Sequence, residues 1–114
     1  MATLYTRTFN FKDSLSDAEV LKEWQFLMDE VIPAIQKVSG IRSAKIYSGA
    51  CALRADITAQ FEMDDAAAYE RLLYDAQVRK LLGRAYGAWD LKTSTQSFRR
   101  EVTPELIRAL SSTS

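Results

Sequence analysis

Apolar and polar residues alternate along several stretches of the chain, a pattern typical of half-buried β-strands. The alternation is clearest before residue 64, where Leu53, Ile57 and Phe61 share one face and polar residues share the other. Three further stretches are rich in β-branched and aromatic residues. We predict strands at residues 3–11, 41–48, 51–63 and 89–98. Gly49, between the second and third strands, predicts a hairpin turn with a positive φ angle at this glycine.

Between the first two strands, apolar residues recur at every third or fourth position, which predicts an amphipathic helix. The predicted apolar stripe consists of Val20, Trp24, Leu27, Val31, Ile35 and Val38. Ser16 and Glu19 have the spacing of a capping box, so the helix should begin near residue 17 and end near residue 38. Pro33 should kink or divide it near residue 31. Gly40 should close it in the left-handed conformation.

A second helix is predicted from residue 66 to residue 74, with Asp64 or Asp65 as its cap. One or two further helical turns should follow over residues 77–82, displaced from the second helix by a break near Asp75. Gly83 and Gly87 should make the segment after them less regular. After the last strand, Thr103 followed by Pro104 predicts a short helix that ends near residue 110.

The order strand–helix–strand–strand–helix–strand, with one apolar sheet face, predicts an α+β fold of the ferredoxin-like type. In this fold a four-stranded antiparallel sheet carries two helices on one face, and we expect residues 1–114 to form one such domain. Tyr5, Phe9 and Tyr47 are expected on the other face, where they would form an exposed apolar patch. A second copy of the chain that presses its own sheet against this patch would cover it, which predicts a homodimer. The pattern of residues 3–11 leaves the opposite orientation of the first strand open.

Composition removes several kinds of chemistry. The chain has no histidine, so it lacks the most versatile acid–base group and the commonest metal ligand. Cys51 is the single cysteine, so one chain can form neither a disulfide nor a cysteine-rich metal site, and we interpret Cys51 as a small apolar residue near a turn. Lys and Arg number 15, as do Asp and Glu, and this balance argues against nucleic acid and anionic membranes as partners.

We therefore expect no cofactor and no bound metal. The start of the chain lacks the apolar segment of a signal peptide, and no apolar run reaches the ~18 residues of a membrane span. The sequence predicts a cytoplasmic protein.

Two segments resemble a known superfamily. Residues 4–12 (Leu-Tyr-Thr-Arg-Thr-Phe-Asn-Phe-Lys) are similar to the opening strand of NIPSNAP-like members of the dimeric α+β barrel superfamily. Residues 75–82 (Asp-Ala-Gln-Val-Arg-Lys-Leu-Leu) resemble the segment that leads into the last strand of such proteins. The resemblance implies a dimer whose two sheets form a barrel, with a small-molecule cavity between sheet and helices or inside the barrel. Members include antibiotic-biosynthesis-monooxygenase-like, cofactor-free oxygenases and also haem-binding enzymes, whose proximal histidine has no counterpart here.

The polar face of the predicted third strand gathers the largest number of functional groups, Arg54, Asp56, Thr58, Gln60 and Glu62. Arg54 and Asp56 would lie about 6–7 Å apart on one face. They could bind a carboxylate or a hydroxyl, or Asp56 could act as a base if burial raised its pKa. Alternatively these residues form ion pairs at the dimer interface or face water.

Arg7 stands between Tyr5 and Phe9 on one face of the first strand. If this face lines a cavity, Arg7 could hold an anionic or enolate substrate while the aromatic rings stack on it. We favour the other interpretation, in which Arg7 contacts the partner sheet.

Aromatic residues supply a further set of candidates for a pocket wall, namely Trp24, Tyr69 and Trp89. Trp24 also has the helical spacing of an ordinary core residue. Tyr47 could donate a hydrogen bond to a ligand oxygen or could cap the end of the barrel.

Three functions are compatible with this sequence. The leading hypothesis is a small homodimeric α+β-barrel protein that binds an apolar or aromatic small molecule. The second is a cofactor-independent oxygenase or isomerase that uses Arg7, Asp56 and Trp24 around a planar substrate. The third is a structural or interaction module whose helix-side pocket is filled by its own side chains. A cavity of ~300 Å³ or more would favour the first two, and Asp56 pointing into it would favour the enzyme.

Overall fold

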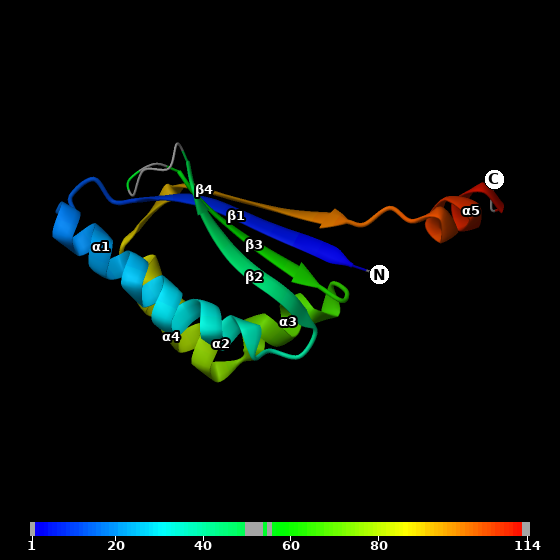
Figure 1. Ribbon diagram of the computed structural model, residues 1–114, viewed down its shortest axis with the longest axis horizontal. Helices are drawn as coiled ribbons and strands as arrows, with labels where there is room; N and C mark the ends of the chain where they lie inside the picture. The colour runs from blue at the N-terminus through cyan, green and yellow to red at the C-terminus, as the bar shows by residue number, and fades with distance from the viewer. Residues whose placement is uncertain (1, 50–53, 55, 113–114) are drawn as a thin grey trace.

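The computed structural model describes residues 2–49, 54 and 56–112 (Figure 1). Its four strands are β1 (Thr3–Phe11), β2 (Ile41–Ser48), β3 (Ile57–Met63) and β4 (Trp89–Arg100). They form one antiparallel sheet in the order β2-β3-β1-β4. Figure 1 shows the helices that follow β1 and β3 packed against one side of this sheet. The predicted ferredoxin-like α+β fold is confirmed, and β4 is an edge strand, as its polar sequence indicated.

The first helical run consists of α1 (Asp17–Phe26), the π-helical turn η1 (Leu27–Val31) and α2 (Ile32–Gln36). The capping box is confirmed, because the Glu19 amide donates to Ser16 Oγ at 3.2 Å and the Ser16 amide donates to Glu19 Oε1 at 2.9 Å. The irregular turn precedes Pro33, which has no amide hydrogen to donate and crowds the preceding turn. Gly40 follows with φ of 91°, as predicted.

The second run is divided into α3 (Ala67–Tyr74) and α4 (Ala76–Tyr86). Asp65 Oδ1 accepts from the Ala68 amide at 3.2 Å, and Asp75 caps α4 by accepting from the Val78 amide at 2.9 Å. The break at Asp75 matches the predicted offset. However, α4 continues through Gly83 to Tyr86, beyond the predicted end at residue 82. Burial of Val78 and Ala85 outweighs the cost of about 1 kcal/mol for a glycine inside a helix.

The first strand has the orientation opposite to the one expected. Tyr5 and Phe9 are buried against the helices, so the prediction that they lie on the uncovered sheet face is wrong. Tyr5 is paired with Phe61 of β3 and Phe98 of β4, and its ring lies 5.6 and 5.0 Å from theirs. A one-residue change of register moves every side chain of a strand to the other face.

The uncovered face of the sheet is mostly polar. Its paired positions include Thr6, Thr8, Thr58, Gln60, Thr95 and Ser97. Thr8 and Thr58 approach each other at 3.4 Å between their hydroxyl oxygens. Tyr47, paired with Thr58, lies on this face and is exposed, as predicted. The dimer was predicted from an exposed apolar patch of Tyr5, Phe9 and Tyr47. Of these three residues, only Tyr47 lies on the uncovered face.

The hydrophobic core lies between the sheet and the helices. Its largest fully buried side chains are Phe9, Val20, Ile35, Ile57, Met63, Leu72 and Val78. The apolar face predicted for the third strand is confirmed from Ile57 onward, whereas residues 51–53 and 55 lie outside the described part of the chain. Cys51, interpreted as a small apolar residue near a turn, is one of these residues outside the described part of the chain. Among the described glycines, Gly40 and not Gly49 has the positive φ angle.

A final helix, α5 (Pro104–Ser112), follows β4, as predicted from the Thr103-Pro104 pair. Thr103 Oγ1 accepts from the Leu106 amide at 3.1 Å. Figure 1 shows α5 at the far end of β4, away from the other helices, and none of its residues is buried. None of the described helices is long and apolar enough to cross a membrane.

Candidate functional site

A pocket of about 40 Å³ lies between the sheet and the second helical run. Its wall includes Tyr5, Arg7, Phe61, Tyr69, Tyr86 and Trp89, which come from three strands and from both α3 and α4. The break at Asp75 lets α3 and α4 each present side chains to the same part of the sheet. The wall is therefore aromatic, with one cationic group.

Arg7 is the cation of this pocket. Its Nε donates to Ser94 Oγ at 3.0 Å, and its Nη1 donates to the Tyr86 hydroxyl at 3.3 Å. The guanidinium carbon lies 5.0 Å from the centre of the Tyr86 ring and 5.3 Å from that of Trp89. No ion pair joins Arg7 to a carboxylate in the part of the chain that the structure describes. Arg7 thus faces the helices, contrary to the favoured interpretation that it meets a partner sheet.

Three rings make up one side of the site. Tyr5 and Tyr69 lie 4.9 Å apart between ring centres, and Phe98 lies 4.8 Å from Tyr69. The Tyr5 hydroxyl donates to Gln96 Oε1 at 2.9 Å. Burial raises the pKa of Tyr5 well above its usual range, and the neighbouring Tyr69 raises it further. Tyr5 is therefore a neutral hydrogen-bond donor at every physiological pH.

Trp89 joins the pocket to the core. Its ring is stacked on Phe9 at 3.7 Å between centres, and the residue is only 4% exposed. Its Nε1 is buried and has no hydrogen-bond acceptor among the described residues. An unpaired buried N–H costs about 1–3 kcal/mol, so such a group calls for a specific explanation.

The structure brings some of the predicted site residues together and separates others. Tyr69 and Trp89 line the pocket with Arg7. Trp24 lies outside it, half-buried against the core, with its ring 6.0 Å from that of Phe11 in an edge-on contact. Tyr47 lies on the opposite face of the sheet.

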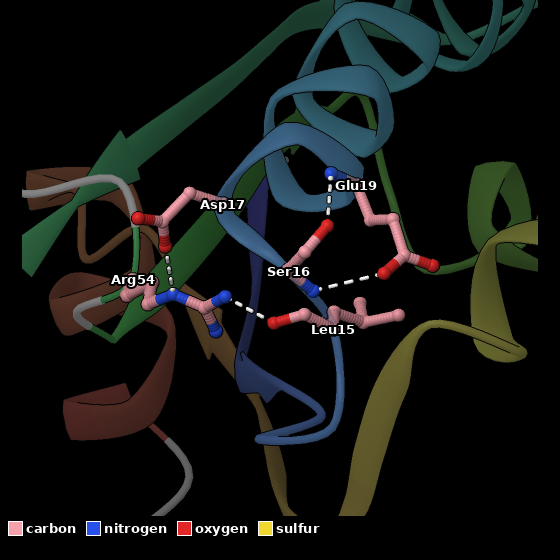
Figure 2. A network of polar contacts seen from close by, with 5 residues as sticks. All are labelled: Leu15, Ser16, Asp17, Glu19 and Arg54. Atoms are coloured by element: carbon pink, nitrogen blue, oxygen red, sulfur yellow. Dashed lines mark hydrogen bonds and ion pairs between the residues drawn. The ribbon is translucent and has the colours of Figure 1, made fainter.

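Arg54 and Asp56 also lie outside the pocket, and neither belongs to the strand β3 in which they were predicted. Figure 2 shows Arg54 at the start of α1, where its Nε donates to Asp17 Oδ1 at 2.8 Å and its Nη2 donates to the Leu15 carbonyl. Arg54 thus ties the segment between β2 and β3 to the beginning of α1. Asp56 is exposed, and its carbonyl accepts from the Gly49 amide at 2.6 Å.

The remaining polar residues of β3 lie on the uncovered sheet face, as predicted. Glu62 lies 3.6 Å from Arg42 of β2, and both side chains are about half exposed. No group of three or more Asp, Glu or Cys side chains that could hold a metal ion gathers within the described residues.

Three polar contributors to the site were missed from the sequence: Tyr86, Ser94 and Gln96. Tyr86 was overlooked because Gly83 was interpreted as loosening the chain, although Leu82 and Tyr86 have the i, i+4 spacing of one helix face. Ser94 and Gln96 are brought to Arg7 and Tyr5 by the pairing of β4 with β1, which the sequence does not reveal.

Comparison with known proteins relates the chain to a fold. No protein-family model matches it, and no curated protein matches its sequence. A dimeric ferredoxin-like protein of unknown function from Bacteroides fragilis superposes with a TM-score of 0.74 at 11% identity, over 88% of this chain and 96% of that one.

Two further solved structures give similar values. A dimeric ferredoxin-like protein from Thermobifida fusca has a TM-score of 0.69 at 13% identity, over 89% of this chain and 92% of that one. SnoaB from Streptomyces nogalater, described as a cofactor-independent oxygenase, has a TM-score of 0.69 at 10% identity, over 90% of this chain and 97% of that one. The chain therefore has the ferredoxin-like fold of these solved structures.

Proposed function

We propose that the protein is a homodimer that binds a small aromatic or apolar molecule in the pocket between its sheet and its helices. The observation that carries this proposal is the composition of the pocket wall, which combines aromatic rings with the single guanidinium of Arg7. Ligand sites are typically apolar and aromatic, with a few polar groups that orient the ligand.

The volume of the pocket limits what it can admit without movement. Its 40 Å³ is far below the ~300 Å³ of an ordinary ligand site, so a ring can enter only if side chains of the wall swing outward. Leu73 is 43% exposed, and Tyr69 and Tyr86 are half-buried on either side of the break at Asp75. A ring that enters the pocket would displace these partly exposed side chains first. The small volume otherwise favours the third hypothesis, a structural module filled by its own side chains.

The homodimer is supported by α5 and by a hollow beside its base. Val102 and Ile107 are 68% and 51% exposed, and a helix of nine residues is not stable without packing. A hollow of about 440 Å³ lies at the C-terminal end of β4. Its lining includes Ala66 and Phe98. A two-fold dimer lets each subunit place its helix in the hollow of the other. The proteins of the same fold from B. fragilis and T. fusca are dimeric, which supports a dimer of this chain.

An NMR titration with the neutral probe 2-naphthalenemethanol tests the pocket. We expect the amide signals of Tyr69, Leu73 and Tyr86 to shift on addition of the probe. Leu73→Trp should fill the mouth of the pocket and abolish the shifts. Leu21→Trp is the matched control, because Leu21 is 47% exposed on α1, and it should bind like the wild type. Absence of pocket shifts in the wild type would support the structural module instead.

The second candidate is a cofactor-independent oxygenase or isomerase, favoured by the fold shared with SnoaB. Of its three nominated residues, Arg7 lines the pocket, whereas Asp56 and Trp24 do not. No carboxylate lines the pocket within the described residues, so a carboxylate base is not at hand. Oxygen uptake with 1,4-dihydroxynaphthalene tests this candidate. The oxygenase is supported if the protein consumes oxygen faster than autoxidation does and Leu73→Trp abolishes this excess. It is contradicted if the rate of oxygen uptake is the same in Leu73→Trp.

A further inference from the structure

We infer that Arg7 and Trp89 form a recognition site for the carboxylate group of a planar aromatic acid. This inference rests on the proposed ligand pocket and specifies the chemical class of its ligand.

The first argument is the charge of Arg7 and its surroundings. Removing a guanidinium from water is costly unless an anion or strong hydrogen-bond acceptors compensate for it. Arg7 contacts neutral groups, namely the hydroxyls of Ser94 and Tyr86, the phenol of Tyr5 and two aromatic faces. By contrast, four arginines with more exposed side chains each lie within 3.6 Å of a carboxylate, namely Arg42, Arg54, Arg84 and Arg108. Arg71 and Arg79 also have no ion pair within the described residues, but they are exposed to water, whereas Arg7 lies in the pocket wall, where an anion can compensate its charge.

The second argument is the unpaired donor of Trp89. Its buried Nε1 has no acceptor among the described residues, although the indole lines the same pocket as Arg7. The guanidinium carbon lies over the indole ring, 5.3 Å from its centre, so the two donors belong to adjacent side chains of one pocket wall. A carboxylate has two oxygens that accept hydrogen bonds, and it therefore suits a pair of separate donors.

The third argument is size and shape. The pocket of about 40 Å³ exceeds the ~30 Å³ that one water molecule occupies in the liquid, which suits a carboxylate but not a ring. The ring of the acid would then lie toward the mouth, between Tyr69 and Leu73. Aromatic side chains there favour a flat partner through stacking and edge contacts.

The experiment compares 2-naphthoate with its neutral analogue 2-naphthamide at pH 7. Both are titrated into Trp24→Phe protein, in which Trp89 is the remaining tryptophan and reports binding by its fluorescence. We expect naphthoate to bind about 10- to 100-fold more tightly than naphthamide, the range that a hydrogen bond to a charged group provides. Equal affinities would overturn the inference, although the pocket would remain.

Two substitutions separate the roles of the two donors. Arg7→Met should remove the preference, so that naphthoate binds no more tightly than naphthamide. Arg84→Met, a surface control that lies over Phe26, should keep the preference. Retention of the preference in Arg7→Met would overturn the role of Arg7. Trp89→Phe, followed by NMR, should weaken naphthoate binding about threefold or more, and unchanged affinity would exclude the indole as a donor. If neither ligand binds the wild type, the pocket itself and the inference both fail.

Discussion

The phenol of Tyr5 links the packing of one residue to the stability of the whole chain. In the folded protein burial raises the pKa of this phenol, whereas in the unfolded chain it ionises near its usual value of about 10. The unfolded state therefore releases a proton above about pH 10 that the folded state keeps. The free energy of unfolding therefore has its full value, as far as Tyr5 is concerned, below about pH 10. It decreases as the pH rises above this value.

Tyr5→Phe should accordingly reduce the alkaline loss of stability. Above pH 10, the wild type should lose up to about 1.4 kcal/mol more per pH unit than the variant, which corresponds to one proton. Urea unfolding between pH 8 and pH 11 measures the difference. Tyr74→Phe is the control, since Tyr74 is highly exposed and should give the same slope as the wild type. Parallel curves for Tyr5→Phe and the wild type would contradict the expected ionisation.

Arg7 shows why the candidate site could be predicted only in part. Its residue type and aromatic neighbours were visible in the sequence, and they suggested an anion site as the alternative to the favoured contact with a partner sheet. Its orientation was not visible, because both alternating sets of residues 3–11 contain apolar side chains. The choice is made by partners far along the chain, Phe61 and Phe98, whose rings pack on Tyr5. Long-range pairing of this kind leaves no local signal.

At the scale of elements, the signals that proved accurate are local ones. The predicted capping residues Ser16, Asp65 and Thr103 accept the expected backbone hydrogen bonds. The errors arose where tertiary packing overrides a local preference, as at Gly83, which lies inside α4 although glycine disfavours helices. The fold class needed only the order of elements, so it was predictable in spite of these errors.

Two glycines make a matched pair of predictions at this scale. Gly40→Ala should destabilise the protein by about 1–2 kcal/mol or more, because φ is 91° and the new Cβ would lie 2.9 Å from Ala68 Cβ. Gly83→Ala should stabilise it by about 0.5–1 kcal/mol, since the site is helical and has no atom within 4 Å of the added Cβ. Thermal and urea unfolding measure both. If both variants changed the free energy of unfolding in the same direction, the predicted difference between the two glycine sites would be wrong.

At the scale of the whole molecule, α5 makes the chain elongated, with principal dimensions of 56, 30 and 21 Å. Sedimentation equilibrium should detect a dimer whose dissociation constant rises about tenfold or more in Ile107→Ser, because this variant removes exposed apolar surface from α5. Arg108→Ser is the neighbouring control, and it should associate like the wild type. A full-length monomer at 100 μM would contradict the homodimer. Equal association of Ile107→Ser would leave the dimer but exclude α5 as its contact.

The threonine-rich sheet face has a thermodynamic consequence for any such dimer. Two faces built from hydroxyl and amide groups remove little hydrocarbon from water when they meet, and they retain bridging solvent between them. The heat-capacity change on dissociation, which follows apolar area, should then be small and should come mainly from the terminal helices. Calorimetric dilution at several temperatures should show a dissociation enthalpy that changes only as much as the apolar area of the terminal helices requires.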